Sequence, residues 1–268
     1  MTHPMHEQTP ALRWPAEAIW QAIEPLLPGF NVEALRQIDS TNSELIRRAR
    51  AGLLAPTLLV ADEQTAGRGR MGRHWRSQAG DSLTFSLGLP LQPVDWQGLS
   101  LAVGLAVAES LHESISLKWP NDLWRQGRKL CGILVETASL PAGEPGRYVV
   151  IGVGINITAA AAALPDERGV APAWLQSLLP GITAPAALER VALPLVRAVQ
   201  AFAHVGFAPF EARFAARDAL AGQTVRLSDG TQGQAEGVDA TGALRVRTAA
   251  GVQRITSGEI SVRLATGA

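Results

Sequence analysis

The residues between Gln64 and Trp75 alternate glycine with arginine in a way that suits the binding of an anion. Glycine permits positive φ and close approach of the backbone, and each arginine offers a planar set of donors that matches carboxylate and phosphate oxygens. Since the segment has little apolar surface to offset the entropy of ordering, we expect it to be poorly ordered when empty and to close over a negatively charged ligand. The residues concerned are Gly67, Arg68, Gly69, Arg70, Gly72 and Arg73.

This Gly/Arg segment alone does not decide between a phosphate ligand and single-stranded nucleic acid, because flexible basic loops bind both. The composition of the chain bears on the choice. Its 268 residues include 24 Lys and Arg and 24 Asp and Glu, which gives a net charge of +0 and a pI near 7.0. Without an overall positive field, general attraction to nucleic acid is weak. A nucleic-acid binder or corepressor is therefore kept only as an alternative.

Four further segments place polar residues at the ends of apolar stretches. In one of them Pro120 fixes φ and holds Asn121 and Asp122 at the end of a strand, although an Asx turn would use the same backbone. In another, glycines within an apolar strand indicate close approach of a ligand or of another backbone. The segments are Asp39-Ser-Thr-Asn42, Lys118-Trp-Pro-Asn-Asp122, Arg128-Lys-Leu-Cys-Gly-Ile-Leu-Val-Glu136 and Gly152-Val-Gly-Ile-Asn156.

In this order and at these separations, the five segments closely resemble those of the biotin-protein ligases, which adenylate biotin and attach it to carboxylase carrier domains. The resemblance runs from about residue 35 to the C-terminus. It implies an α+β fold, with a catalytic domain related to class II aminoacyl-tRNA synthetases around a central sheet and a small SH3-like C-terminal barrel. It also implies ATP and Mg²⁺ as cofactors, biotin as substrate, and the biotin carboxyl carrier domain of acetyl-CoA carboxylase or a related carboxylase as partner.

The resemblance implies a role for each polar group. The position of Lys129 contacts both the biotin carboxylate and the α-phosphate, so Lys129 is assigned the central electrostatic role; the alternative is a solvated lysine in a hairpin turn. The other residues assigned to catalysis are Arg68, Arg70, Lys118 and Asp122. Biotin binding is assigned to Ser40, Thr41, Asn42, Gln64, Gly67, Arg68, Gly69, Arg70, Lys129 and Gly132. ATP binding is assigned to Arg70, Arg73, Trp75, Lys118, Asn121, Asp122 and Asn156, with Mg²⁺ near Asp122 and Asn156.

The chemistry explains why cations dominate these sets. Joining the biotin carboxylate to the α-phosphorus of ATP brings two anions together, so the site must supply positive charge and hydrogen-bond donors. Ser40, Thr41 and Gln64 suit the ureido ring of biotin, although helix capping would also account for Ser40 and Thr41. Trp75 is expected to pack against the closed loop, with a core position as the alternative.

Two hypotheses concern later steps. Asp122 is placed to orient or deprotonate the carrier lysine, whose amine is almost entirely protonated at pH 7. The Gly/Arg segment is expected to retain reactive biotinyl-adenylate by excluding water, so that Arg70→Gly would release it. One departure from the family concerns the C-terminal contact with ATP: Ile255 stands where the family often has tryptophan, and Arg254 could partly substitute for it.

A lipoate-protein ligase or octanoyltransferase is the main alternative, because these enzymes share the catalytic architecture and also acylate a carrier lysine. It is disfavoured because the Gly-Arg-Gly-Arg-x-Gly-Arg and Lys-Trp-Pro-Asn-Asp motifs together belong to the biotin branch. Many biotin ligases also carry an N-terminal winged helix-turn-helix, which needs three helices. Since one short helix is predicted before residue 35, the chain resembles the monofunctional form of the family.

The surrounding sequence predicts the elements that must position these residues. Residues 1–34 are expected to form a tail and a short helix, with Trp20, Ile23 and Leu27 on one face. Residues 35–220 are expected to form the catalytic domain, and 221–268 the small barrel of short alternating strands. A capping box of Thr41 and Glu44 is expected to open the next helix. Later helices are predicted over 97–113, 188–202 and 209–220, and strands over 58–61, 83–89, 115–119, 130–137 and 148–156. A long connection with one short helix near Trp174 is predicted over 158–186.

The remaining features limit the cellular setting. The lone cysteine, Cys131, lies in an apolar run and is expected to be a reduced core residue. Residues 1–10 lack the apolar centre of a signal peptide, and the apolar run at 99–108 is too short to span a bilayer. We therefore expect a cytoplasmic enzyme, monomeric or weakly dimeric, with no membrane or nucleic-acid partner.

Overall fold

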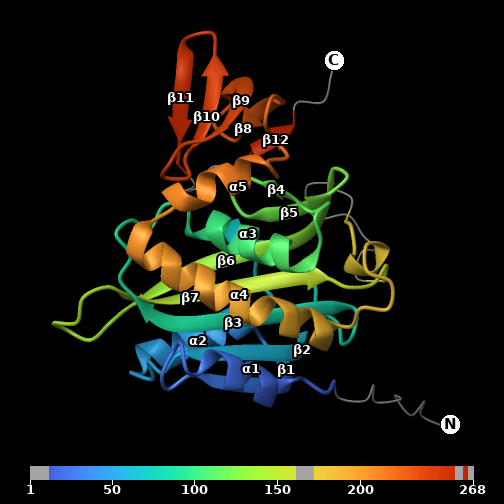
Figure 1. The fold of residues 1–268 in the computed structure, drawn as a ribbon, viewed down its shortest axis with the longest axis vertical. Coiled ribbons are helices and arrows are strands. Elements are labelled where there is room, and N and C mark those ends of the chain that lie inside the picture. Colours follow the sequence, from blue (N-terminus) through green and yellow to red (C-terminus); the bar gives the residue numbers. More distant parts are fainter. Residues whose placement is uncertain (1–11, 161–171, 257–261, 265–268) are drawn as a thin grey trace.

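The computed structural model describes residues 12–160, 172–256 and 262–264, and its larger part is built on one mixed sheet. The strands of this sheet are β1 (Asn31–Ile38), β2 (Thr57–Gln64), β3 (Ser82–Leu91), β4 (Ser116–Lys118), β5 (Asp122–Arg125), β6 (Arg128–Ser139) and β7 (Arg147–Asn156). Their order is β1-β2-β3-β7-β6-β5-β4. Strands β1 and β2 are parallel, whereas the other neighbours run antiparallel (Figure 1).

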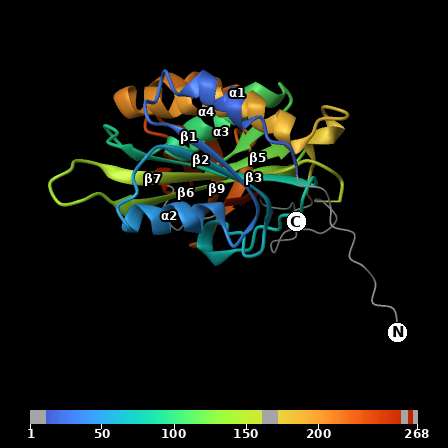
Figure 2. The ribbon, with the colours of Figure 1, turned by 90° about the horizontal axis from the view of Figure 1, so that it is seen from below.

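Helices cover both faces of the large sheet. Figure 2 shows α1 (Ala16–Ile23), α3 (Leu99–Leu111) and α4 (Ala184–Val205) on one face, and α2 (Thr41–Arg50) on the other. The alternation along β3 explains this division, because Leu83, Phe85 and Leu87 belong to the core formed with α3 and α4. Its intervening polar residues, Ser82, Thr84 and Ser86, are also buried and face the opposite side. A polar, buried sheet face is therefore available beside α2.

The second sheet lies at one end of the first and is wholly antiparallel. Its strands are β8 (Thr224–Leu227), β9 (Gln232–Val238), β10 (Leu244–Thr248), β11 (Gly251–Ile255) and β12 (Val262–Leu264), in the order β11-β10-β9-β8-β12. Short helix α5 (Glu211–Ala215) precedes it. Two consecutive residues at the end of β4 connect the sheets: the Lys118 Nζ donates to the Val262 carbonyl at 2.8 Å, and the Trp119 Nε1 donates to the Gly242 carbonyl at 3.0 Å.

Most predicted elements are confirmed. The five predicted strands correspond to β2, β3, β4, β6 and β7, and the helices predicted over 97–113 and 188–202 correspond to α3 and α4. Cys131 is free and fully buried, and its burial raises the pKa of the thiol, as expected of a core residue. Among the described helices, none combines the length and the apolar character needed to cross a membrane.

Several predictions about local structure are wrong. No strand was expected at β1, and the helix expected over 209–220 is reduced to a 3-10 turn (Ala208–Phe210) and α5. The α1 face that meets the core carries Ile19 and Ile23, whereas Trp20 is 44% exposed. The cap of α2 is Ser40 rather than Thr41, because the Ser40 hydroxyl accepts from the Ser43 N–H. Thr41 is thereby released from the role that capping would have given it.

The parts of the chain outside the described residues include the predicted N-terminal tail, residues 161–171 of the long connection and the Ser-Gly-Glu-Ile stretch after Thr256. The described part of that connection contains the short helix expected near Trp174, as a 3-10 turn (Leu175–Ser177).

The contact between Trp119 and Gly242 leads to a stability prediction. Trp119 is fully buried, so Trp119→Phe leaves the Gly242 carbonyl without this donor and should lower the free energy of unfolding by about 1–3 kcal/mol. Urea unfolding followed by circular dichroism measures the change. Trp20→Phe is the matched control and should stay within about 0.5 kcal/mol of the wild type. A Trp119→Phe protein as stable as this control would contradict the bridging role.

Candidate active site

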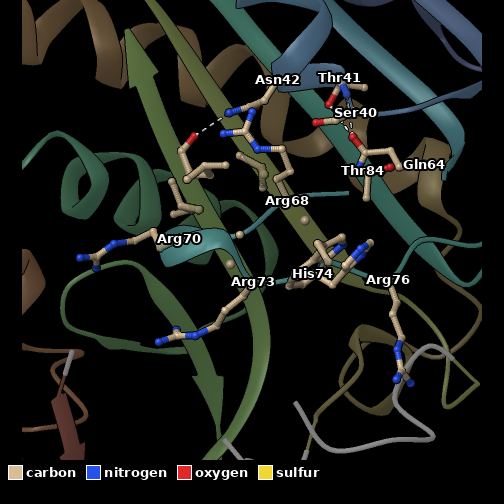
Figure 3. Close-up of a pocket in the computed structure, with 18 of the residues that line it drawn as sticks. Ser40, Thr41, Asn42, Gln64, Arg68, Arg70, Arg73, His74, Arg76 and Thr84 are labelled. Atoms are coloured by element: carbon tan, nitrogen blue, oxygen red, sulfur yellow. Dashed lines mark hydrogen bonds between the residues drawn. The ribbon is translucent and has the colours of Figure 1, made fainter. Parts of the chain in front are cut away.

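A pocket of about 300 Å³ opens on the α2 face of the large sheet. Its walls come from the start of α2, from β3, β6 and β7, and from the loop that follows β2 (Figure 3). In the same view Ser40, Thr41 and Gln64 gather at one end, and Arg70 and Arg73 lie toward the other. The pocket therefore has an end rich in neutral polar groups and an end rich in cations.

The Gly/Arg loop, residues 64–75, closes on itself through backbone hydrogen bonds. The Gly69 N–H donates to the Arg73 carbonyl at 2.7 Å, and the Trp75 N–H donates to the Gly67 carbonyl at 2.9 Å. A Cβ at Gly67 would overlap the Trp75 carbonyl, and Gly72 has a φ of 72°. Gly69 differs, because its φ is −118° and a Cβ there would meet nothing closer than 3.6 Å. Glycine is thus required by this loop geometry at two of the three predicted positions.

The glycines of β6 and β7 line the pocket and make room for side chains that pack on the sheet. A Cβ at Gly154 would overlap the Trp75 indole, and one at Gly132 would lie 3.2 Å from it. A Cβ at Gly152 would overlap the Asn42 carboxamide. Trp75 therefore packs against the sheet beneath the closed loop, which agrees with the predicted packing against this loop.

The cationic end of the pocket is organised around Lys129. Its Nζ lies 2.9 Å from the Asp122 Oδ1 and 5.7 Å from the centre of the Trp75 ring. Arg70 donates to the Asn121 Oδ1 at 3.1 Å, and burial lowers the pKa of its guanidinium. Arg73 also lines the pocket. Positive charge is therefore concentrated beside the buried carboxylate of Asp122.

The structure brings most of the predicted site residues to this pocket, with three exceptions. Gly67 shapes the loop without lining the pocket, whereas Lys118 and Asp122 line a much smaller adjoining hollow of about 10 Å³ together with Arg70, Arg73 and Asn121. Lys118 is 4% exposed, and its Nζ lies 5.0 Å from the centre of the Trp124 ring. The side chain of Lys118 thus supports the sheet connection as well as adjoining the cationic end.

Hydrogen bonds fix the neutral end. The Gln64 Oε1 accepts from the Thr41 N–H at 2.7 Å and from the Thr41 hydroxyl at 3.0 Å. Asn42 spans the sheet face, where its Nδ2 donates to the Leu134 carbonyl at 3.3 Å. These contacts hold the hydroxyl and amide groups in fixed orientations. Next to them the pocket is an apolar slot, lined in part by Phe85, Ile133, Leu134 and Val153.

Several pocket residues were not predicted. They are His74, Arg76, Thr84, Phe85, Ile133, Leu134, Val153 and Pro172. For Thr84 a signal was present in the sequence, because Ser82, Thr84 and Ser86 alternate with apolar residues along a strand whose composition otherwise indicates full burial. Pro172 had no such signal, since it reaches the pocket through the bridge that pairs it with Lys129.

Ile255, which stands where the family often has tryptophan, and Arg254, which could partly substitute for it, both have contacts of their own. Ile255 is buried in the core, at 8% exposure. Arg254 donates to Asp239, to Thr241 and to Gln97. Partial burial by itself would raise the pKa of Asp239, but hydrogen bonds from Thr241 and Arg254 outweigh it and lower the pKa to about 2. Arg254 thus already serves as the partner of a carboxylate.

The residues expected near Mg²⁺ fit a hard cation to different degrees. The Asp122 carboxylate is buried, and its Oδ1 has the ion pair with Lys129 but no hydrogen bond among the described residues. A carboxylate of this kind, together with phosphate oxygens, is the usual ligand set of protein-bound Mg²⁺. Asn156 directs its Nδ2 to the Lys129 and Ala173 carbonyls, so the Oδ1 is the atom through which it would act.

Comparison with known proteins gives matches in both parts of the chain. Residues 34–156 match the Biotin/lipoate A/B protein ligase family, and residues 221–263 match the Biotin protein ligase C terminal domain. The bifunctional ligase/repressor BirA of Escherichia coli is 36% identical over 254 residues, which cover 89% of this chain and 76% of BirA. The biotin–[acetyl-CoA-carboxylase] ligase of Paracoccus denitrificans is 34% identical over 248 residues, which cover 84% of this chain and 98% of that enzyme.

Solved structures show the same fold. The biotin protein ligase of Aquifex aeolicus in complex with biotin and ATP superposes with a TM-score of 0.72 at 30% sequence identity, covering 88% of this chain and 99% of that one. A point mutant of the same Aquifex protein, in complex with biotin, gives a TM-score of 0.74 at the same identity and coverage. The predicted class II synthetase-like fold, with a mixed central sheet and a C-terminal antiparallel sheet, is confirmed.

The loop geometry predicts a difference between two of its glycines. Gly67→Ala should open the loop, because its Cβ would overlap a backbone oxygen that cannot move independently. Gly69→Ala should keep the loop closed, since its methyl meets ordinary contact distances. Trypsin cleavage after Arg68, Arg70 and Arg73 measures the opening, and we expect cleavage at least several-fold faster in Gly67→Ala. Equal cleavage of the two variants would contradict the assignment.

Proposed function

Because the chain belongs to the biotin protein ligase family, we propose that its pocket activates biotin with ATP and transfers the biotinyl group to a carrier lysine. The observation that carries this function is the division of one pocket into a neutral polar end, an apolar slot and a cationic end. Biotin has the same three parts in the same order: a ureido ring, an apolar thiophane with its valeryl chain, and a carboxylate. The enzyme is a biotin–[acetyl-CoA-carboxylase] ligase.

The neutral end suits the ureido ring. We assign Ser40, Thr41, Asn42 and Gln64 to it, since together they offer hydroxyl and amide groups on a buried surface. A buried polar ligand group needs such partners to replace its lost water. Gly132 belongs to the floor beneath the slot, where its missing side chain admits both Trp75 and the stem of Lys129.

The cationic end suits the first half-reaction. A carboxylate oxygen of biotin attacks the α-phosphorus of ATP, a new P–O bond forms, and pyrophosphate leaves with the electrons of the broken bond. We assign Lys129, Arg70 and Arg73 to stabilise the charge that builds between the two anions, and Lys118 and Asn121 to the phosphates nearby. Mg²⁺, when bound through Asp122 and the phosphates, adds further positive charge at that point.

The second half-reaction forms an amide. The lysine amine of the carrier attacks the acyl carbon of biotinyl-adenylate, AMP leaves, and the amine loses a proton. Only about one such amine in a few thousand is neutral at pH 7. We propose that Asp122 accepts this proton or orients the amine, and its position beside Lys129, at the cationic end of the pocket, supports this role.

The partner is a carboxyl carrier protein. We propose the carrier domain of acetyl-CoA carboxylase or of a related carboxylase, a monomer or weak homodimer as the enzyme's state, a cytoplasmic location, and no nucleic-acid partner. The Paracoccus denitrificans relative is named a biotin ligase and the Aquifex aeolicus structures contain biotin, which disfavours a lipoate ligase or octanoyltransferase.

The function is tested by incubating the protein with biotin, Mg²⁺ and α-labelled ATP in the absence of a carrier. Biotinyl-adenylate and pyrophosphate should form and separate on thin-layer chromatography. Octanoate in place of biotin should give no adenylate. Intact ATP with biotin, in a protein shown to be folded, would refute the proposal, and adenylate from octanoate alone would favour the lipoyl branch.

The bond between Arg70 and Asn121 leads to a prediction about how biotinyl-adenylate is retained. Arg70 ties the Gly/Arg loop to Asn121, so Arg70→Gly should release biotinyl-adenylate and label lysines of a bystander protein such as serum albumin at least tenfold faster than the wild type does. Met71→Gly is the matched control, because Met71 is 56% exposed and has a φ of 59°, which glycine adopts without strain. An Arg70→Gly protein that holds the adenylate but is inactive would contradict the prediction.

The proposed role of Asp122 predicts different effects of its substitution on transfer to two nucleophiles. With preformed biotinyl-adenylate, Asp122→Asn should slow transfer to the carrier lysine by at least tenfold, because the amine then lacks its proton acceptor. Transfer to hydroxylamine, which is mostly neutral at pH 7, should change much less. Quenched-flow sampling measures both rates. An unchanged rate with the carrier, or an equal loss with both nucleophiles, would exclude the proposed role.

A further inference from the structure

The chain contains very few side chains that could accept an activated acyl group. Among its 24 Lys and Arg residues only Lys118 and Lys129 are lysines, and Cys131 and Tyr148 are its only cysteine and tyrosine. Neutral amines, thiolates and phenolates attack activated acyl groups, whereas serine and threonine hydroxyls need an adjacent base. An acyl group on histidine is itself activated and is lost to water. A lasting acyl bond therefore has four candidate side chains in this protein.

The thiol and the phenol are both shielded by burial. Cys131 is 0% exposed and Tyr148 is 1% exposed. Burial disfavours the anionic form of each group. It raises the pKa of the Cys131 thiol, and it raises the pKa of Tyr148 to about 12. Neither group is therefore an anion at neutral pH, and neither meets solvent.

The two lysine amines are both engaged. Lys118 is 4% exposed, and its Nζ donates to the Val262 carbonyl at 2.8 Å. Lys129 lines the pocket, where its Nζ forms an ion pair with the Asp122 Oδ1 at 2.9 Å. An ammonium group has three N–H donors and no lone pair. In this state Lys129 stabilises anionic oxygens beside it without acting as a nucleophile.

Apart from Lys129 and His74, the basic side chains that line the pocket are arginines. Arg68 is paired with Glu136, and the other three, Arg70, Arg73 and Arg76, are called the arginine rim here. A guanidinium stays charged in proteins and so lacks the neutral form that attack on an acyl carbon requires. A lysine always has a small neutral fraction. The arginine rim thus supplies positive charge without supplying an acceptor.

We propose that the arginine rim, together with the shielding of the four nucleophiles, determines acceptor specificity: the chain offers no acceptor to its own activated biotin. The acyl group then passes only to an amine that another molecule brings to the pocket. In that transfer the amine lone pair forms the bond to the acyl carbon, the bond from this carbon to the phosphate oxygen breaks, AMP leaves, and the nitrogen loses a proton. The inference rests on the proposed function, because it concerns biotinyl-adenylate.

The first test adds preformed biotinyl-adenylate in excess to a mixture of wild-type protein and serum albumin. Peptide mass spectrometry measures the biotin on each lysine, and the α-amino group is counted separately because much of it is neutral at pH 7 to 8. We expect at least tenfold less biotin on Lys118 and Lys129 than on the average albumin lysine. Wild-type protein unfolded in urea is the control, and its two lysines should be labelled as those of albumin are.

The second test places a new amine at the pocket. Arg73→Lys and Arg76→Lys keep the positive charge of the arginine rim. Arg190→Lys is the matched control, because Arg190 is exposed on α4, which covers the sheet face opposite the pocket (Figure 2). With preformed biotinyl-adenylate, we expect the new amine at the rim to be labelled at least tenfold faster than the one on α4, since the pocket holds the adenylate beside it.

The outcomes separate this inference from the proposed function. Folded wild-type lysines labelled as fast as those of albumin, or rim variants both labelled no faster than Arg190→Lys, would each overturn the specificity role. In both cases wild-type protein would still form biotinyl-adenylate from biotin and ATP in the assay without a carrier. Wild-type protein that forms no adenylate would instead overturn the proposed function, and this inference with it.

Discussion

The site depends on the absence of side chains at two positions of β7. Gly152 and Gly154 let the Asn42 carboxamide and the Trp75 indole lie directly on the sheet, where any larger residue would overlap them. Through these two contacts, α2 and the Gly/Arg loop reach the same sheet face from separate parts of the chain. Close packing of this kind transmits small displacements, because protein interiors have few voids to absorb them. The pocket is thus defined by how closely two distant segments approach one pair of strands.

Few carboxylates balance the cationic side chains around the pocket. At the cationic end Lys129 pairs with Asp122, and Arg70 is held by the neutral Asn121. At the other end the charge of Arg68 is neutralised by Glu136, so Arg68 fixes the position of the loop and adds little to the positive potential of the pocket. The net positive charge that would face two anionic substrates therefore comes from a small number of side chains beside β5 and β6, although the chain as a whole is neutral. Local arrangement, and not overall composition, supplies the field.

Sequence patterns predicted what depends on neighbours in the chain. Apolar runs gave the central strands and α3, and the motifs identified most residues that line the pocket. Strand β1 was missed because Glu, Ala, Leu, Arg and Gln favour helix, and its extended form depends on parallel pairing with β2. The contacts of Glu136 could not be predicted either, since its partners come from α2 and from the loop, far away in the sequence. Such positions are fixed by tertiary packing alone.

The direct contacts of residues 118 and 119 with the second sheet also bear on how such proteins can be recombined. Lys118 and Trp119 bind backbone carbonyls of that sheet, and Asn121 and Asp122, a few residues further along, belong to the catalytic surroundings. An exchange of C-terminal parts between relatives keeps these two bonds only where the new part places its backbone carbonyls at the same positions. A functional chimera therefore has to match the backbone path of the C-terminal part to the stretch at residues 118 and 119, and not only the sequence at the point of fusion.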